Sequence, residues 1–394
     1  MHHKALSTLK FLPMLVCFIS GSSYAAGNLG QPTIAETVDA TIKPLVQKYN
    51  IPGMAIAITV DGKNYFYNYG VASKETKQAI TNATLFEIGS MSKTFTATLA
   101  SSAQVDGKLS FSDNASKYLP ALRGSSFDNI SLLNLGTHTS GGLPLQFPDD
   151  VQTNDQLFAY YKNWKPDHPA GTYRTYSNPS IGMLGMITAK SMNISYDDAI
   201  EKKLFPALGI KHSYINVPAN QMKYYAQGYT KTDAPVRLNP GILSSEAYGV
   251  KSNTVDMIRF VEANMQVIKL DQKLQRAIND THTGYFKAGG MTQDLIWEQY
   301  PQSADLNQVL EGNSDAMVYN PTKVTEITPP LAPQKDVYIN KTGSTNGFGG
   351  YVAFIPASKI GIVILANKNY PVDARVTAAY QILSQLKSEI TQKK

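Results

Sequence analysis

The sequence has almost no cysteine, and this excludes several ways of stabilising the chain. Cys17 is the only cysteine among 394 residues. It lies in an N-terminal segment that we expect to be removed, so the remaining chain can form neither disulfides nor thiolate metal sites. The protein must be held together by its hydrophobic core, which a chain of this length can supply in one large or two interleaved domains.

Histidine is also scarce, which argues against zinc chemistry. No two histidines have the H-E-x-x-H or H-x-H spacing of a metal site, so we expect no metal and no cofactor. If no histidine acts as a base, lysine and tyrosine become the candidates for proton transfer. The histidines beyond residue 25 are His138, His168, His212 and His282.

Runs of like charge and long apolar segments are missing from most of the chain. The formal net charge is +6, but it forms no block of five and no basic stripe interleaved with aromatics. This argues against a nucleic-acid partner. No segment after residue 25 is long and apolar enough to cross a membrane. We expect a monomer that acts on a small molecule.

The first residues have the order of a secretory signal peptide. Lys4 and Lys10 accompany the apolar run "FLPMLVCFIS", and the small residues of "GSSYAAG" follow. The apolar run is too short to span a bilayer, and Ser23 and Ala25 fit the positions before a cleavage site. We therefore expect residues 1–25 to be removed and the mature protein to work in the periplasm.

Both ends of the mature chain predict a sheet packed against a helix. Thr33 and Glu36 form a capping box that starts the first helix. "GMAIAITVDGKNYFYNYGVAS" predicts a hairpin around Asp61 and Gly62. Near the other end, "DVYINKTG", "GYVAFIP" and "IGIVILAN" predict three strands, and residues 375–390 predict an amphipathic helix.

The middle of the chain reads mainly as helices and long loops. The expected fold class is α/β (α+β), an antiparallel sheet flanked by terminal helices, with a mainly helical inserted domain. A sheet must bury a face against another layer, so we assign residues 26–104 and 300–394 to the sheet domain and residues 105–299 to the helical one. The active site is expected in the cleft between them.

The stretch "FEIGSMSKTF" places Ser90 three residues before Lys93 at the start of a helix-compatible segment. On a helix this spacing puts both side chains on one face. Lysine can serve as a base only where burial or nearby cations keep it partly neutral. The alternative is a helix cap beside a solvated lysine. The same spacing recurs at Ser7 and Ser384, where we expect no function.

Two further motifs are weak when taken singly. "RTYSNPS" supplies Tyr176 and Asn178, and a phenol can shuttle protons if cations beside it lower its pKa. "INKTGSTNG" supplies Lys341 at the end of a predicted strand, whose edge can bind an amide-like ligand. The alternative for Tyr176 is a loop tyrosine whose hydroxyl is bonded to the backbone. The alternative for Lys341 is a surface lysine in a hairpin turn.

Together, S-x-x-K, Y-x-N and K-T-G in this order resemble the serine β-lactamases and penicillin-binding proteins. The sequence is most similar to the class C β-lactamases. The similarity covers nearly the whole mature chain, including "YNIPGMAIAI", "FEIGSMSKTFTATLA", "YSNPSIGMLG", "NPGILSSEAYGVKS" and "KTGSTNGFGGYVAFIP". It implies the β-lactamase/transpeptidase-like fold and hydrolysis of cephalosporins and penicillins through a serine acyl-enzyme, which confers antibiotic resistance.

The resemblance also implies roles for single residues. Ser90 would be the nucleophile, Lys93 and Tyr176 the proton relay, and Lys341 the group that tunes Tyr176. The backbone N–H groups of Ser90 and Ser344 would form the oxyanion hole. The residues that the resemblance places against the substrate are Gln146, Asn178, Tyr248, Thr342, Gly343 and Asn369.

The chain departs from the family pattern at two positions near these motifs. Val372 stands where the family often has an asparagine that contacts the substrate carboxylate, which bears on drug and inhibitor preference. His138 stands in "THTSGG" where tyrosine is usual, and the sequence assigns it no role.

Other functions on the same fold remain open from the sequence. A D,D-peptidase would be trapped by penicillin, an esterase would prefer simple esters, and a non-catalytic sensor would stay acylated. The intact K-T-G motif and the similarity along the whole mature chain favour the lactamase.

Overall fold

The computed structural model describes residues 1–2 and 33–392, and the expected signal peptide and its cleavage position lie outside the part described. Within residues 33–392, nine strands form one antiparallel sheet in the order β12-β8-β9-β10-β13-β14-β15-β1-β2. The other strands of these residues form three two-stranded sheets, β11-β4, β3-β7 and β5-β6. All the strands together are β1 (Gly53–Val60), β2 (Lys63–Gly70), β3 (Phe86–Glu87), β4 (Tyr173–Arg174), β5 (Gly228–Tyr229), β6 (Pro235–Val236), β7 (Lys251–Ser252), β8 (Gly284–Ala288), β9 (Met291–Gln293), β10 (Glu298–Pro301), β11 (Thr322–Lys323), β12 (Thr325–Leu331), β13 (Val337–Ser344), β14 (Gly349–Ile355) and β15 (Ile360–Ala366).

Helices pack on both faces of this sheet. The α-helices are α1 (Ile34–Lys48), α2 (Ser92–Val105), α3 (Ala115–Tyr118), α4 (Leu132–Gly136), α5 (Asn154–Asn163), α6 (Asn178–Ser191), α7 (Tyr196–Asp198), α8 (Phe205–Leu208), α9 (Ser244–Ala247), α10 (Thr254–Asn264), α11 (Gln272–Asp280), α12 (Leu306–Gly312), α13 (Asp315–Tyr319) and α14 (Val372–Gln392). A single 3₁₀ turn, η1 (Gly89–Met91), precedes α2. None of the helices within residues 33–392 is long and apolar enough to span a membrane.

The predicted N-terminal hairpin is confirmed. β1 and β2 pair antiparallel around Asp61 and Gly62, which both have positive φ, as a tight hairpin turn of this kind requires. The other edge of β1 pairs with β15, from Met54 opposite Ala366 to Val60 opposite Ile360. The first and last strands of the described residues are therefore neighbours, next to the edge strand β2.

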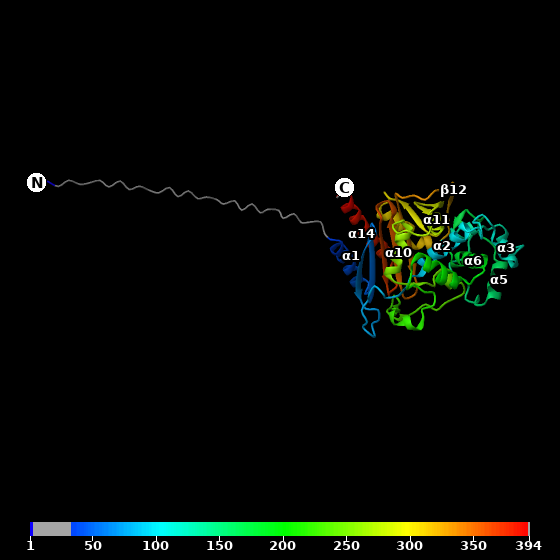
Figure 1. Cartoon of the computed structure of the whole chain (residues 1–394), viewed down its shortest axis with the longest axis horizontal. Helices are drawn as coiled ribbons and strands as arrows, with labels where there is room; N and C mark the ends of the chain where they lie inside the picture. Colours follow the sequence, from blue (N-terminus) through cyan, green and yellow to red (C-terminus); the bar gives the residue numbers. More distant parts are fainter. Residues whose placement is uncertain (3–32, 393–394) are drawn as a thin grey trace. The chain divides into compact units, whose positions relative to one another are not determined.

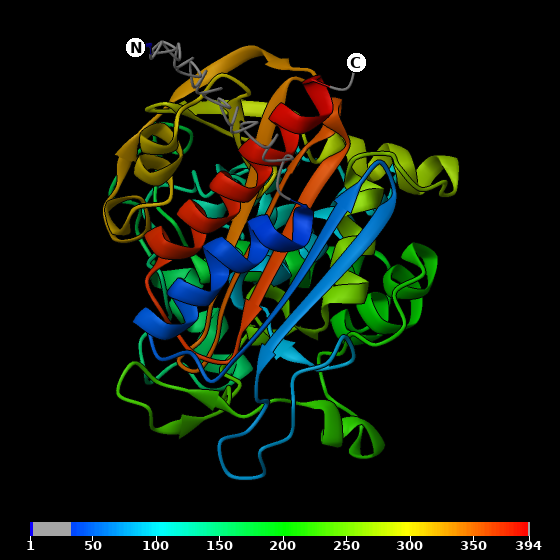
Figure 2. The same ribbon diagram turned by 90° about the vertical axis from the view of Figure 1, so that its left-hand side faces the viewer.

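The terminal helices cover one face of the sheet, as the sequence predicts. Figure 2 shows α1 and α14 side by side across this face. The capping box between Thr33 and Glu36 is present at the start of α1. Successive side chains of β1 alternate between faces, and Ile56 and Ile58 join the apolar core under the two terminal helices. α14 begins at Val372, three residues earlier than predicted.

The opposite face of the sheet packs on α2 and α10, in a core that includes Ala55 and Ala57 of β1 and Phe95 of α2. α2 is buried on almost every side, because its Ala97 and Ala100 belong to a second core shared with α6. Polar side chains of α2, including Lys93 and Thr96, are buried as well. α2 therefore connects the sheet to the helices α3, α5 and α6, which gather on the side away from α1 and α14 (Figure 1).

The sheet takes in more of the chain than the sequence indicates. β8 and β9 lie within residues 105–299, the range assigned to the mainly helical part, yet they join the sheet through β10, which pairs with β13. The sheet therefore resumes at residue 284 rather than at residue 300. Without β9 the outer edge of β10 would be unpaired, and a sheet avoids such an edge by pairing or covering it.

Candidate active site

Ser90 lies in η1, directly before the buried helix α2. The Nζ atom of Lys93 donates hydrogen bonds to Oγ of Ser90 at 3.0 Å and to the carbonyl oxygen of Ala247 at 2.8 Å. The side chain of Lys93 is fully buried, with 0% exposure. This burial rules out the alternative of a solvated lysine beside a helix cap.

Two glycines allow the Ser90 segment to touch the end of β13. Gly89 has φ +53°, and a Cβ atom there would lie 2.5 Å from the carbonyl oxygen of Ser344. A Cβ atom on Gly343 would lie 2.0 Å from the carbonyl oxygen of Ile88. Only glycine tolerates such a close backbone approach. The backbones of Ser90 and Ser344 are thereby held next to each other.

Tyr176 lies between three cationic groups and is 6% exposed. The centroid of its ring is 5.0 Å from Nζ of Lys341, 5.3 Å from Nζ of Lys93 and 5.4 Å from Cζ of Arg174. The motifs that contain Ser90, Tyr176 and Lys341 are far apart in the sequence, and the fold brings them to one place.

These charges bring two proton-transfer groups into the same pH range. Burial raises the pKa of Tyr176, but Lys341, Lys93 and the Ser90 hydroxyl outweigh it, and the pKa falls from 10.0 to about 8. Burial lowers the pKa of Lys93 from 10.5 to about 8, opposed by Tyr176 and reinforced by Lys341. Two neighbouring groups with such similar pKa values titrate as a coupled pair and can exchange a proton near neutrality.

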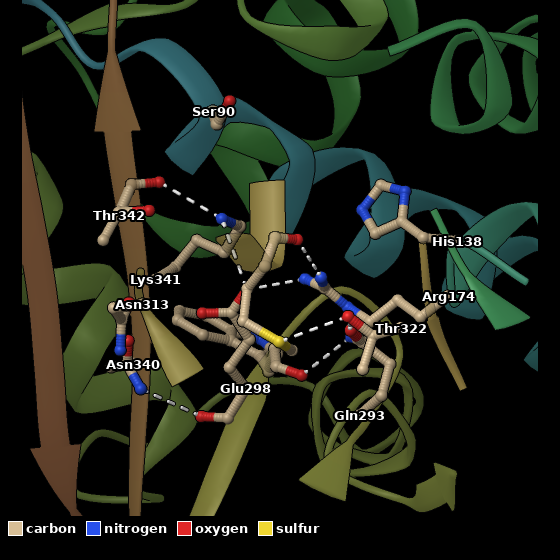
Figure 3. A network of polar contacts seen from close by, with 12 residues as sticks. Ser90, His138, Arg174, Gln293, Glu298, Asn313, Thr322, Asn340, Lys341 and Thr342 are labelled. Atoms are coloured by element: carbon tan, nitrogen blue, oxygen red, sulfur yellow. Dashed lines mark hydrogen bonds and ion pairs between the residues drawn. The ribbon is translucent and has the colours of Figure 1, made fainter. Parts of the chain in front are cut away.

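A buried ionic network joins Lys341, Glu298 and Arg174 (Figure 3). Lys341 is 1% exposed, and its Nζ atom lies 3.9 Å from Oε1 of Glu298. The same oxygen pairs with Nη2 of Arg174 at 3.1 Å, and Nε of Arg174 donates to Gln293 at 2.6 Å. One carboxylate thus faces two cations, which leaves net positive charge beside the phenol.

The structure places the sequence-predicted site residues around one cleft of about 700 Å³. Lys93 does not line the cleft and lies behind Ser90. Val372, one of the two departures from the family pattern, also lines it. The predicted residues on the cleft wall are Ser90, Gln146, Tyr176, Asn178, Tyr248, Lys341, Thr342, Gly343, Ser344 and Asn369.

Sequence reasoning missed Glu87, a buried carboxylate three residues before Ser90. It accepts hydrogen bonds from Oγ1 of Thr345 at 2.5 Å, the hydroxyl of Tyr225 at 2.6 Å and the N–H of Leu238 at 2.7 Å. Glu87 therefore ties the Ser90 segment to the turn after β13 and to the loop that forms another wall. The sequence signal that could have identified Glu87 is a single acidic residue within the apolar run "LFEIG".

Arg174 and Glu298 were also not predicted as site residues, because they belong to no shared motif and are paired only by the tertiary fold. Within the described part of the chain, His, Cys, Asp and Glu nowhere form a group of three or more that could hold an ion. The chemistry available is that of a serine hydroxyl beside a lysine and a tyrosine that can both give up a proton near neutrality.

Comparison with known proteins gives consistent matches along the chain. Residues 38–387 match the family described as Beta-lactamase. A curated relative from Pseudomonas fluorescens with the name Beta-lactamase is 53% identical over 353 residues, covering 90% of this chain and 99% of the relative. A solved class C beta-lactamase in complex with cefoxitin is 59% identical, with a TM-score of 0.87, covering 89% of this chain and 98% of that chain.

A solved beta-lactamase/D-alanine carboxypeptidase from Pseudomonas syringae is 55% identical, with a TM-score of 0.88 and coverage of 89% of this chain and 98% of that one. The order of the motifs, the fold and the grouping of Ser90, Lys93, Tyr176 and Lys341 agree with these matches. The chain therefore belongs to the β-lactamase family, in its class C branch.

Proposed function

We propose that this class C β-lactamase opens the lactam ring of cephalosporins and penicillins through an ester formed on Ser90. The observation that carries the proposal is the hydrogen bond from the buried Lys93 to Oγ of Ser90, beside a tyrosine whose pKa is about 8. A serine hydroxyl needs such a partner to lose its proton during attack.

The two half-reactions follow from these groups. Oγ of Ser90 attacks the lactam carbonyl while its proton passes to the pair formed by Tyr176 and Lys93. The C–N bond then breaks, and Tyr176 returns the proton to the leaving nitrogen. In the second half, Tyr176 takes a proton from water, the hydroxide attacks the ester carbonyl, and Ser90 recovers its proton as the acid departs.

The developing oxyanion is assigned to the backbone N–H groups of Ser90 and Ser344. The direct contact between Gly89 and Ser344 supports this assignment, because it fixes the two peptide segments against each other. Preorganised donors of this kind commonly contribute about 3–4 kcal/mol to transition-state stabilisation.

Substrate recognition is assigned to the walls of the cleft. Gln146 and Asn178 would contact the amide side chain of the drug, with Tyr248 on the same side. The carboxylate would lie near Lys341, Thr342 and Asn369, with Gly343 leaving the strand edge open. Val372 offers no hydrogen bond, so we expect recognition of the carboxylate to depend more on its other partners.

A D,D-peptidase or esterase on the same fold is the second candidate. One similar structure is described as both β-lactamase and D-alanine carboxypeptidase, and acylation of the serine is common to both activities. A third candidate is a β-lactam sensor that stays acylated. The fate of the acyl-enzyme separates the three.

Turnover of a chromogenic cephalosporin by the purified protein tests the proposal. Many product molecules per enzyme support the lactamase. A single burst with a stable adduct in the mass spectrum would refute it in favour of a peptidase or sensor, and hydrolysis of simple esters alone would favour an esterase.

We further propose that the enzyme is exported to the periplasm as a monomer, where it confers resistance to β-lactams. The basic, apolar and small residues of positions 1–25 support export. We also propose two lobes, the sheet with its terminal helices and the helical insertion, with the cleft between them. Sequencing of the mature N-terminus from a periplasmic fraction tests the cleavage after Ala25.

A further inference from the structure

One histidine is bonded to the chain on both sides of Tyr176. The carbonyl oxygen of His138 accepts the N–H of Thr175 at 2.8 Å, and Nδ1 of its ring accepts the N–H of Ser177 at 3.2 Å. The imidazole also packs against the phenol, with ring centroids 4.4 Å apart and an interplanar angle of 40°. A single residue therefore contacts the ring of Tyr176 and hydrogen-bonds the residues directly before and after it.

We propose that His138 is a positioning residue that holds the Tyr176 phenol in line with Ser90. Its side chain is 1% exposed and does not line the cleft, so it has no surface for the substrate. Its effect must pass through Tyr176, which does line the cleft. This inference rests on the proton-transfer role proposed for Tyr176.

The hydrogen bond from Ser177 fixes the chemical state of the imidazole. Nδ1 can accept a hydrogen bond only if it carries no hydrogen of its own. The ring is therefore neutral, and its one N–H is on Nε2. Burial, reinforced by Arg174, Lys93 and Lys341, holds the pKa of His138 well below 6.5. The ring therefore keeps its acceptor throughout the range in which Tyr176 and Lys93 titrate.

Other features of His138 are unfavourable for a residue that only fills space. Its φ of +60° lies in the left-handed region, which is uncommon for a residue with a Cβ atom. Its Nε2 atom is buried without a hydrogen-bond partner among the described residues, and a buried unpaired donor costs stability. An apolar side chain would avoid the second cost but could not accept the N–H of Ser177.

The test is a double-mutant cycle between His138 and Tyr176. We expect His138→Ala to lower kcat/KM for a chromogenic cephalosporin by about 10- to 100-fold, at or below the low end of the roughly 10²–10⁴-fold that positioned proton transfer contributes. KM should stay nearly unchanged, because His138 does not face the cleft. In a Tyr176→Phe background the same substitution should cost less than about twofold, since the hydroxyl it positions is gone.

Two conservative variants separate the contacts and guard against misfolding. His138→Asn keeps an acceptor for Ser177 and removes the ring, whereas His138→Phe keeps a ring and removes the acceptor. Each of these two variants should lower kcat/KM by less than His138→Ala does. His282→Phe is the matched control, because His282 is another buried histidine whose pKa burial lowers to about 4, and it does not line the cleft.

An equal loss from His138→Ala in both backgrounds would overturn the inference, because it would show a general structural role. A loss confined to KM, or no loss in any His138 variant, would overturn it as well. Failure of the proposed function looks different: there Tyr176→Phe alone would leave turnover intact, whatever the His138 variants do.

Discussion

Replacing Lys341 by methionine removes one positive charge beside Tyr176 and should raise the pKa of the phenol. Nζ of Lys341 lies 5.0 Å from the centroid of the ring, and the lysine is buried. At an effective dielectric of about 20, a unit charge at this distance contributes about 3 kcal/mol, or about two pKa units. The pKa of Tyr176 would thus return from about 8 to about 10, near that of free tyrosine.

The phenolate fraction at pH 7 would fall from about one in ten to about one in a thousand. Lys341 also lowers the pKa of Lys93, so its removal moves both bases in the same direction. We expect kcat/KM at pH 7 to fall by about 100-fold. The acidic limb of the pH profile should move to higher pH by about two units, so that part of the loss is recovered in alkaline buffer.

The assay is the pH dependence of kcat/KM with a chromogenic cephalosporin, together with ultraviolet titration of the phenol against a Tyr176→Phe reference. Lys341→Arg keeps the charge and should keep the position of the limb. Lys251→Met is the matched control, because Lys251 is another buried lysine, which donates to the carbonyl oxygen of Ile215 and does not line the cleft. A 100-fold loss with an unmoved limb and an unmoved phenol pKa would refute the electrostatic reasoning.

Three further predictions concern other parts of the site and its surroundings. Ser90→Ala should form no drug adduct in a mass spectrum while its circular dichroism stays native, whereas Ser384→Ala, at the same motif spacing on the exposed side of α14, should acylate normally. Gly89→Ala should lower both the melting temperature and kcat, because its Cβ would lie 2.5 Å from the carbonyl oxygen of Ser344. The strained backbone at this position adds a cost of about 1–3 kcal/mol. If both values were unchanged, the close contact would be contradicted. Burial raises the pKa of Glu246 from 4.5 to about 7, so the folded state holds a proton that the unfolded chain releases, and stability should fall as pH rises from about 4.5 to about 7 by up to about 3 kcal/mol. Glu246→Gln should remove that part of the slope, and parallel curves of melting temperature against pH for the two proteins would show the reasoning to be wrong.

Features carried by short local stretches could be predicted from the sequence. The hairpin around Asp61 needs only its turn residues and the alternation of β1 and β2. The last two strands, β14 and β15, are apolar runs with clear ends. Ser90 and Lys93 meet because the chain between them is helical. The structure places these predicted elements where the sequence indicates.

Features that depend on distant contacts could not be predicted. β9 has three residues and β10 has four, too few to show a period of two. Arg174 and Glu298 come from separate elements with no shared motif, and only the fold pairs them. Besides Ser90, Lys93 donates a hydrogen bond to the backbone carbonyl oxygen of Ala247. Every residue has such a carbonyl group, so the sequence does not show which one lies near Lys93.

The pairing of β1 with β15 has a consequence for how the protein is made. Nearly all residues of β1 are buried, yet its neighbour β15 leaves the ribosome only after every other strand described here. Until then the nascent hairpin carries an apolar ribbon with an open side, the condition under which chains stick to one another. The open side of β1 must therefore be protected until β15 has been made, and a frameshift that removes β15 and α14 would leave β1 and β14 without the strand that pairs with both.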